Sequence, residues 1–380
     1  MQACAKSRRR ARILKIAAAG TAALSLWISP DLTFASASNQ GNNSVAHASP
    51  AKPAGTLPGK PSTHAKAAAL IDVTSGRLLY SSHGDESMLI ASTTKIMTAI
   101  IAIEQSDLDG IVTVSNRAAG KEGSSIYLKA GEKMKLKDML YGLMLRSGND
   151  AATAIAEHVG GSLDGFVYLM NAKAEEIGMT HSHFANPSGL DQKGHFASAN
   201  DMAKLAAYAL HSPTFREIVG TKVKTAPNPA EKWGYRWVNK NKMLHLYEGA
   251  DGVKTGYTKQ ALRTLVSSAT RDGRQLAAVT LNDGDDWNDH AKLLDYGFAA
   301  YRMEQVIAKG AAIKDYPFVA ASTFRYPFAE GERSAVEIRL DLYGPETTDY
   351  KLGYRGRLSY RLKDEPIGAV ELLPQAPAAD

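Results

Sequence analysis

The sequence predicts a mixed α/β (α+β) domain followed by a small C-terminal all-β domain. Strand patterns lie at both ends of a helix-rich middle, and beyond about residue 303 polar and apolar residues alternate between turns, which is typical of β-strands. We therefore expect one large domain over residues 65–303 and a β-rich domain over residues 304–380. The expected strands of the large domain form two hairpins: Ala67–Asp72 with Arg77–Ser81, and Arg263–Ala269 with Gln275–Leu281.

The helices are predicted from apolar residues that recur every three or four positions. Five such segments lie between the two hairpins, and a sixth follows the second hairpin. They are Ser92–Glu104, Leu136–Leu145, Asp150–Val159, Asp164–Ile177, Asn200–Ala209 and Asp286–Phe298. The strands expected in the C-terminal domain are Ser334–Leu342, Leu358–Leu362 and Ile367–Leu373.

Residues 1–37 have the three parts of an export signal. A basic stretch precedes an apolar run, Ile16–Ile28, and Ala35-Ser36-Ala37 offers a cleavage site. The apolar run is short for a membrane span, although an uncleaved anchor remains an alternative. Residues 38–64 are rich in Ser, Asn, Gly, Pro and Ala, which predicts a flexible linker. We expect an exported protein, outside the cell or on the wall and outer face of the cytoplasmic membrane.

The charge and the cysteine count narrow the possible functions. Of the net charge of +6, residues 1–37 carry +5, because six basic residues there face only Asp31. The rest of the chain is nearly neutral, which argues against nucleic-acid binding. Cys4, the only cysteine, precedes the apolar run and would leave with the signal. The mature chain would then have neither a disulfide nor a thiol nucleophile.

Ser92-Thr93-Thr94-Lys95 opens a predicted helix. Residues three apart share a helix face, so the Lys95 amine can reach the Ser92 hydroxyl. A serine hydroxyl is a poor nucleophile without a base, and a lysine is a base only when its pKa is depressed by burial or by a second cation. Alone, the pattern also fits an N-cap serine followed by a solvated lysine.

Two further segments complete a set. Ser147-Gly148-Asn149 lies between two predicted helices. In a functional interpretation, Ser147 can relay a proton and Asn149 can bind an amide. In a structural interpretation, Gly148 is simply a C-cap and Asn149 or Asp150 is an N-cap. Lys254-Thr255-Gly256 precedes the second hairpin and is expected on a strand that edges a cleft. Gly256 would let a substrate backbone approach that strand, and Lys254 and Thr255 could bind a carboxylate.

In this order, the three segments resemble the motifs of the penicillin-recognising serine enzymes. Wider stretches resemble the D-alanyl-D-alanine carboxypeptidases, the small penicillin-binding proteins. These stretches are Ala91–Ala99, Leu145–Ala152, Asn186-Pro-Ser-Gly-Leu190 and Gly252–Thr258. The resemblance covers residues 65–300. It implies a β-lactamase/transpeptidase-like fold, removal of the terminal D-alanine from peptidoglycan stem peptides, covalent inhibition by β-lactam antibiotics, and no cofactor.

The resemblance also implies roles for individual residues. Ser92 is the implied acyl-enzyme nucleophile and Lys95 the acylation base. Ser147 and Lys254 would handle the proton for the leaving D-alanine, while Asn149 holds the peptide amide. Thr255 would bind the terminal carboxylate, and the backbone N–H groups of Ser92 and Tyr257 would form the oxyanion hole, beside Gly256. Arg263 is a further candidate for binding the substrate carboxylate. The alternative is that Arg263 forms a salt bridge on its strand.

Some features depart from the resemblance or leave alternatives open. Leu262 stands where relatives often have glycine, and the chain's end shows no basic apolar stripe, so membrane association is left open. A D,D-endopeptidase and a β-lactamase are enzyme alternatives. Glu217 and Glu231 lie between the second and third motifs, but neither lies in a deacylating pattern. His181 and His183 lack a third ligand, so no metal site is predicted. A non-catalytic wall-binding protein is the alternative from another class.

Overall fold

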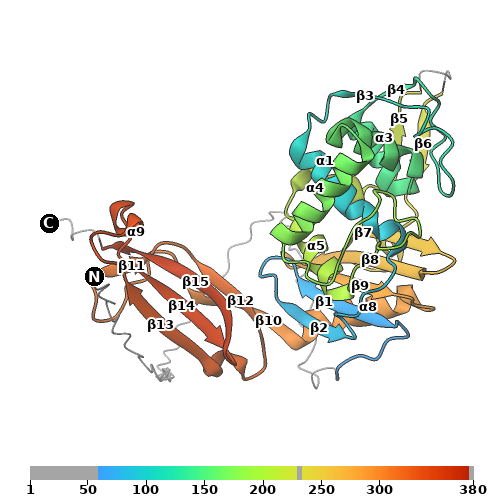
Figure 1. The fold of residues 1–380 in the computed structure, drawn as a ribbon. Coiled ribbons are helices and arrows are strands. Elements are labelled where there is room, and N and C mark those ends of the chain that lie inside the picture. Colours follow the sequence, from blue (N-terminus) through green and yellow to red (C-terminus); the bar gives the residue numbers. More distant parts are fainter. Residues whose placement is uncertain (1–58, 229–232, 376–380) are drawn as a thin grey trace, which may run out of the picture. The chain divides into compact units, whose positions relative to one another are not determined.

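A computed structural model of the chain describes residues 59–228 and 233–375 (Figure 1). The chain folds into two compact units, one with residues 59–306 and 325–330, the other with residues 307–324 and 331–375. The predicted export signal, most of the predicted linker and the chain's last five residues lie outside the described residues. The prediction of a mixed α+β fold with a β-rich C-terminal part is confirmed.

The first unit is built on a five-stranded antiparallel sheet with the strand order β2-β1-β9-β8-β7. Asp272 and Gly273 link β8 to β9 with positive φ at both residues, as the tightest hairpins require. The order leaves one side of β7 unpaired. The strands are β1 (Ala67–Asp72), β2 (Leu78–Ser82), β7 (Ala250–Thr258), β8 (Leu262–Arg271) and β9 (Arg274–Leu281).

The remaining elements of this unit are mainly helices, with two small strand pairs. Two short segments are not α-helical: η1 is a 3₁₀ turn and η2 is a π-helix. The bounds are η1 (Ala91–Thr94), α1 (Lys95–Gln105), β3 (Ile111–Thr113), β4 (Lys133–Lys135), α2 (Leu136–Tyr141), η2 (Gly142–Arg146), α3 (Asn149–Gly160), α4 (Leu163–Glu176), α5 (Ala199–Leu210), α6 (Pro213–Gly220), β5 (Val223–Ala226), β6 (Tyr235–Val238), α7 (Met243–Leu246) and α8 (Asp286–Ala300).

Helices cover both faces of the sheet, so its strands are apolar on both sides. Successive residues of a strand point to opposite faces, and here they join two different buried clusters. Ala69 and Ile71 of β1 join the cluster that contains α1 and α5, whereas Ala68 and Leu70 join the cluster that contains α8. The sheet therefore separates the α1 side of the unit from the α8 side.

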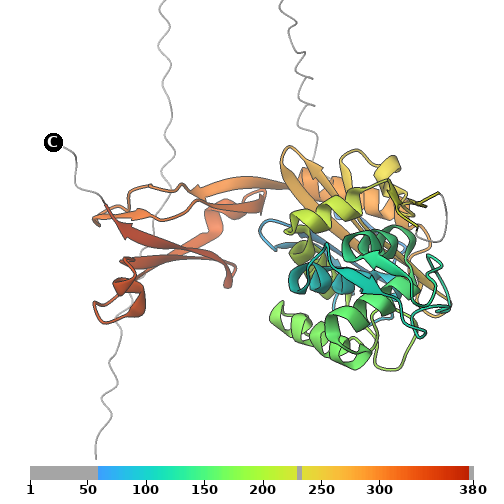
Figure 2. The same ribbon diagram turned by 90° about the horizontal axis from the view of Figure 1, so that it is seen from above.

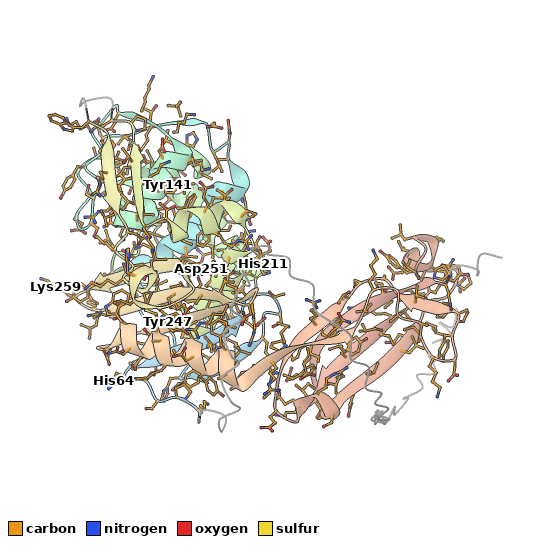
Figure 3. The ribbon with its side chains drawn as sticks, turned by 180° about the vertical axis from the view of Figure 1, so that it is seen from behind. His64, Tyr141, His211, Tyr247, Asp251 and Lys259 are labelled. Atoms are coloured by element: carbon orange, nitrogen blue, oxygen red, sulfur yellow. The ribbon has the colours of Figure 1, made fainter. Side chains whose placement is uncertain are left out.

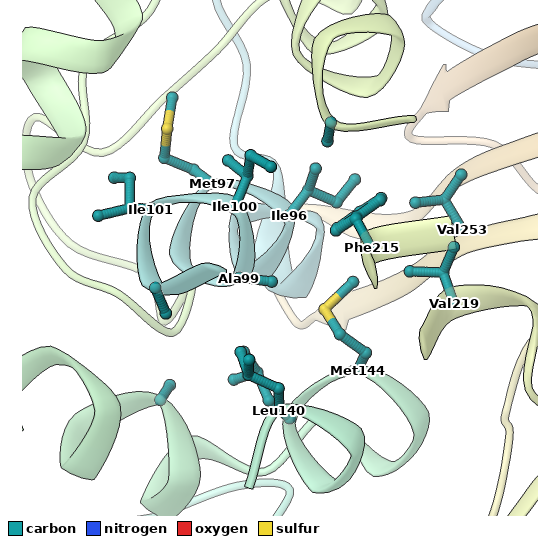
Figure 4. Packing of buried hydrophobic residues seen from close by; sticks show 14 of the residues in the cluster. Ile96, Met97, Ala99, Ile100, Ile101, Leu140, Met144, Phe215, Val219 and Val253 are labelled. Atoms are coloured by element: carbon teal, nitrogen blue, oxygen red, sulfur yellow. The ribbon is translucent and has the colours of Figure 1, made fainter. Parts of the chain in front are cut away.

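Helix α1 is buried on all sides rather than on one face. Its residues from Lys95 to Ala102 are all inaccessible, and apolar side chains of α2, η2, α6 and β7 surround it (Figure 4). A one-sided apolar stripe was the basis of the sequence prediction, but Met97 and Ile101 are buried as well. The first residue of this helix, Lys95, is therefore carried into the interior of the unit.

The second unit is a four-stranded antiparallel sheet with the order β11-β15-β14-β13 (Figure 2). A short helix and a 3₁₀ turn lie between its strands, and the unit is β-rich as predicted. The pair β10 and β12 joins the units along the chain. The bounds are β10 (Tyr301–Ile307), β11 (Phe318–Ala320), β12 (Phe324–Ala329), η3 (Glu332–Ala335), β13 (Val336–Leu342), α9 (Thr348–Lys351), β14 (Gly356–Leu362) and β15 (Glu365–Pro374).

Among the helices of residues 59–228 and 233–375, none combines the length and apolar character that crossing a bilayer requires.

Candidate active site

The first predicted pair, Ser92 and Lys95, is brought together at the start of α1. Ser92 lies in the 3₁₀ turn η1, one turn ahead of the α-helix, and Lys95 is the first α-helical residue. Lys95 Nζ lies 3.1 Å from Ser92 Oγ. The spacing argument therefore leads to the right contact, although the turn that makes it is 3₁₀ rather than α.

The Lys95 amine is buried and fully enclosed by hydrogen-bond acceptors. It donates to Asn149 Oδ1 at 2.7 Å and to the Ser188 carbonyl oxygen, in addition to its contact with Ser92. Burial holds the pKa of Lys95 well below its ordinary value, and the positive charges of Lys254 and Lys240 lower it further. A neutral amine can accept the Ser92 hydroxyl proton, which a charged amine cannot.

The segment Ser147-Gly148-Asn149 adopts a different cap from the one expected. Ser147, not Gly148, takes the left-handed conformation (φ 66°) that ends η2, and Gly148 is the N-cap of α3. Asn149 is the first residue of that helix, so neither it nor Asp150 is the cap. Ser147 is 4% exposed, and its Oγ has no hydrogen-bond partner among the described residues. A buried, unpaired hydroxyl is rare and marks a group available to a ligand or a proton.

A loop that the sequence did not single out holds this segment in place. The Asp150 carboxylate accepts hydrogen bonds from the backbone N–H groups of Ile126 and Leu128 and from the Ser125 hydroxyl. Asn149 Nδ2 donates to the Glu122 carbonyl oxygen at 2.7 Å. Asn149 therefore has both ends of its amide fixed, one by this loop and one by Lys95.

The third motif lies on β7, the edge strand, which runs from near Asp251 to just before Lys259 (Figure 3). Lys254 is 2% exposed, its Nζ donates to the Thr255 carbonyl oxygen at 2.8 Å, and burial lowers its pKa to about 7, with Lys240 as a second cause. A Cβ added to Gly256 would lie 3.0 Å from Ser92 N. The glycine therefore lets β7 approach the Ser92 turn itself.

Three predicted substrate-binding residues differ in their surroundings. Thr255 is half-buried and the Tyr257 side chain is 63% exposed at the open edge of the sheet. Arg263 is bound to Asp286 at the start of α8, through two hydrogen bonds to its carboxylate. Its neighbour Thr264 points to the other face, where its hydroxyl donates to the Ile90 carbonyl oxygen. The structure thus places Arg263 on the α8 side, in the salt bridge that was the alternative.

Lys240 is a site residue that the sequence prediction missed. Its Nζ donates to Ser124 Oγ at 3.2 Å, and its positive charge lowers the pKa of both Lys95 and Lys254. Burial lowers the pKa of Lys240 itself. No sequence signal marks this lysine, because it follows a short strand in a segment without a recognisable motif.

The segment Asn186–Leu190 packs against the Ser92 turn and contacts Lys95. The Asn186 side chain accepts hydrogen bonds from the backbone N–H groups of Ser188 and Gly189, and this turn presents the Ser188 carbonyl oxygen to Lys95. Gly189 has φ +83°, and an added Cβ would fall 1.8 Å from the Ala91 carbonyl oxygen. Glycine is therefore required for contact with the Ser92 turn. The Asn-Pro-Ser-Gly run was a signal for this turn.

A buried histidine also supports the Ser92 turn. His195 Nδ1 accepts from the Ala185 N–H, so Nε2 carries the proton and donates to Thr94 Oγ1 at 2.8 Å. The Thr94 hydroxyl in turn donates to the Ala91 carbonyl oxygen. Burial lowers the pKa of His195 to about 4, so the ring is neutral at physiological pH and acts as a fixed connector.

Two other candidate groups lie away from these residues. His64, Asp285 and Asp289 have possible metal-ligating atoms within 4.8 Å of one another, beside α8 (Figure 3), but Asp289 already pairs with Lys292. Glu217 accepts hydrogen bonds from Tyr141 and Lys137, while Glu231 lies outside the described residues. The structure therefore brings neither a metal cluster nor Glu217 to Ser92.

One cluster contains the Ser92 hydroxyl, the buried Lys95 amine beside it, and two further lysines, Lys240 and Lys254, whose pKa values are lowered. The two cations lower the proton affinity of the Lys95 amine, and the unpaired Ser147 hydroxyl is two residues from Asn149, which binds that amine. Such a site can form and break a covalent ester on Ser92 with its own side chains.

The chain is similar to a well-defined set of known proteins. Residues 54–285 match the family D-alanyl-D-alanine carboxypeptidase. The D-alanyl-D-alanine carboxypeptidase of Bacillus subtilis is 37% identical over 257 residues, which span 66% of this chain and 66% of that protein. A Mycobacterium tuberculosis counterpart is 34% identical over 256 residues, covering 65% of this chain and 87% of that protein.

Solved structures agree with these sequence matches. Penicillin binding protein 5 of Haemophilus influenzae has a TM-score of 0.69 at 27% identity, covering 84% of this chain and 98% of that one. The Streptomyces K15 DD-transpeptidase has a TM-score of 0.60 at 32% identity, covering 63% of this chain and 99% of that one. The resemblance found in the sequence is confirmed, and so is the predicted enzyme class, a serine-type D-Ala-D-Ala carboxypeptidase. The chain belongs to the D-alanyl-D-alanine carboxypeptidase family of penicillin-binding serine peptidases.

Proposed function

We propose that this chain removes the terminal D-alanine from peptidoglycan stem peptides through an ester on Ser92. The observation that carries the proposal is the 3.1 Å contact between Ser92 Oγ and a fully buried Lys95 amine whose pKa is depressed. Lys95 takes the hydroxyl proton as Ser92 Oγ attacks the carbonyl carbon of the penultimate D-alanine. The bond to the terminal D-alanine nitrogen then breaks, and that nitrogen leaves as an amine after gaining a proton.

The other residues of the three motifs transfer the proton to the leaving group, stabilise the oxyanion and bind the substrate. The unpaired Ser147 hydroxyl, with Lys254 as the second cation, carries the proton to the leaving nitrogen. The backbone N–H groups of Ser92 and Tyr257 stabilise the oxyanion, since the approach at Gly256 brings the edge of β7 against the Ser92 turn. Asn149 binds the peptide amide and Thr255 the terminal carboxylate. Water then hydrolyses the ester and frees Ser92.

The same chemistry makes β-lactam antibiotics covalent inhibitors. Their strained amide acylates Ser92, but no amine departs, so the ester persists until water reaches it. Substrate and inhibitor both lie outside the cytoplasm, which agrees with the export signal expected in residues 1–37. We therefore propose that the enzyme is exported and works on the cell wall.

Intact-protein mass spectrometry after incubation with benzylpenicillin tests the proposal. The natural chain should gain the mass of one penicillin, and Ser92→Ala should gain none. Thr93→Ala is the matched control, because it changes a neighbouring hydroxyl that bonds only to the Ile90 carbonyl oxygen, and it should still be acylated. Release of D-alanine from a D-Ala-D-Ala peptide by the natural chain should be lost with Ser92→Ala. An adduct that survives Ser92→Ala would refute the assignment.

A further inference from the structure

The four-stranded sheet of the second unit has one covered face and one open face. On the covered face the ring of Phe324 stacks on Tyr360, with 4.9 Å between the ring centroids. The open face has a groove of about 550 Å³ over β13, β14 and β15, which lie side by side (Figure 1). This volume is within the range of sites that bind ligands. The groove has no part in the reaction at Ser92, so its function must be sought in its own side chains.

The register of the strands places three arginines around one serine in this groove. Arg357, Ser359 and Arg361 alternate along β14, so their side chains lie on the same face of the sheet. Arg339 of β13 is the direct cross-strand partner of Ser359. Cross-strand partners are about 5 Å apart, and alternate residues of one strand are about 7 Å apart. The small serine side chain therefore lies between three guanidinium-bearing side chains that all line the groove.

The acidic groups nearby hold these arginines only weakly. Arg339 Nε donates to Asp341 Oδ1 at 3.0 Å, and Arg357 Nε lies 3.7 Å from Glu371 Oε1, beyond hydrogen-bond distance. Arg361 donates to a backbone carbonyl oxygen. All three arginines are exposed, and exposed ion pairs contribute at most about 1 kcal/mol. A ligand with several strong acceptors can therefore bind all three guanidinium groups.

The charges that line the groove favour an anionic ligand. Three arginines against one carboxylate, that of Asp341, give the lining a net charge of +2. Among the described residues that line the groove, every cation is an arginine, and the planar guanidinium fork matches the oxygens of a phosphate group.

The spacing of the arginines indicates a chain rather than a single ion. Arg357 and Arg361 are four residues apart on β14, which corresponds to about 13 Å along an extended strand. One small anion cannot contact both backbone positions closely, whereas a polymer with a negative charge at each repeat can meet the arginines in turn. The groove is concave, so a flat bilayer would contact its rim rather than its floor.

We propose that this groove binds a phosphodiester-linked polymer of the cell envelope, with Arg339, Arg357 and Arg361 contacting successive phosphates. The choice of an envelope polymer rests on the location at the cell wall that belongs to the proposed function, whereas the preference for an anionic chain rests on the groove alone. Binding there holds the enzyme at the wall independently of Ser92 and gives the second unit a role of its own.

Binding of the natural full chain to fluorescently labelled poly(glycerol phosphate), followed by anisotropy, tests the proposal. The affinity should fall with salt, and log K against log salt concentration should have a slope of about −2 if three phosphates are neutralised. The triple variant Arg339→Gln, Arg357→Gln, Arg361→Gln should bind about tenfold more weakly, as the loss of three exposed ion pairs implies. Its salt dependence should be flatter.

A charge-matched control separates the groove from the overall charge of the unit. Lys309→Gln, Lys314→Gln, Lys351→Gln removes the same charge from exposed positions of the second unit that do not line the groove, and it should bind the polymer within about twofold of the natural chain. Ser359→Asp keeps the three arginines but places a carboxylate between them, so it should also weaken binding by about tenfold. This variant decides the question if the arginine variant fails to fold.

An affinity for the polymer that is unchanged in the arginine variant or in Ser359→Asp would overturn the proposal, as would no binding by the natural chain. Tighter binding to poly-L-glutamate, or to vesicles of phosphatidylglycerol and phosphatidylcholine in equal parts, would overturn it too, because these offer carboxylates or a lipid surface instead. Ser92→Ala should bind the polymer as the natural chain does. If penicillin fails to acylate Ser92 while the polymer binds at the arginines, the proposed function fails and this site stands.

Discussion

Replacing Lys254 by methionine should stabilise the protein while impairing its reaction with penicillin. Lys254 is buried, and its pKa falls from an ordinary value of 10.5 to about 7. At pH 7 the unfolded chain keeps this proton, whereas the folded chain has lost about half of it. Unfolding therefore takes up protons, and stability rises with pH between about 7 and 10.5. Linkage converts the pKa difference into a cost of roughly 4 kcal/mol at pH 7.

Methionine fills a similar volume without a charge, so it removes that cost. The variant loses one hydrogen bond, from Nζ to the Thr255 carbonyl oxygen, which is worth about 1 kcal/mol. The net gain of roughly 3 kcal/mol should raise the unfolding temperature of the first unit by about 6–12 °C. At pH 9 the gain should fall by about 2 kcal/mol, because the natural protein has recovered part of its stability.

Thermal unfolding at pH 7 and pH 9, alongside acylation by a fluorescent penicillin, measures both effects. Lys129→Met is the control, since Lys129 is exposed and its replacement should alter neither quantity by much. A Lys254→Met protein that unfolds at a lower temperature than the natural chain, or that gains as much at pH 9 as at pH 7, would refute the reasoning. So would acylation at the natural rate.

Three other changes have definite expected outcomes. Lys240→Met removes a positive charge that lowers the pKa of Lys254. The midpoint that Lys254 contributes to the pH profile of kcat/KM should therefore move to higher pH, and an unchanged midpoint would contradict the coupling. Gly189→Ala should lower the free energy of unfolding in urea by about 3 kcal/mol and slow acylation, because its Cβ would fall on the Ala91 carbonyl oxygen. Gly178→Ala is the control: this glycine also has positive φ but lies in open space, so the loss should be only about 1 kcal/mol. Equal losses would argue against the contact. Arg263→Gln should leave the peptide KM within about twofold, because its guanidinium binds Asp286, and a tenfold rise would restore Arg263 as a substrate ligand.

Local spacing was enough to predict the central contact of the site. Ser92 and Lys95 lie three residues apart, and any helical turn, 3₁₀ or α, places them on one side. The hairpin of β8 and β9 was equally local, since Asp272-Gly273 between alternating apolar residues specifies a tight turn. The strand nature of Lys254–Gly256 followed from its position just before that hairpin.

The contacts that depend on the tertiary fold could not be predicted in this way. Lys240 influences the site from far along the chain, and His195 reaches Thr94 across 101 residues. The orientation of Arg263 depends on which face of β8 meets α8, and a sequence pattern buried on both faces does not distinguish them. Ser147 takes the left-handed conformation although a glycine follows it, whereas Gly148 has φ −59° and is needed for space, since an added Cβ would lie 2.7 Å from Asp150 Oδ1.

The unpaired edge of β7 has a consequence for how the protein behaves at high protein concentration. An edge strand with free N–H and C=O groups can pair with any extended chain, including another copy of itself, and this is a common route to aggregation. An enzyme that binds its substrate along such an edge cannot cover it with a permanent neighbour. Its protection must come from its surroundings: the Ser92 turn lies against β7 at Gly256, and the Thr258 hydroxyl at the end of the strand bonds to Asp191. Mutations that lengthen or flatten this edge should therefore reduce solubility before they reduce activity.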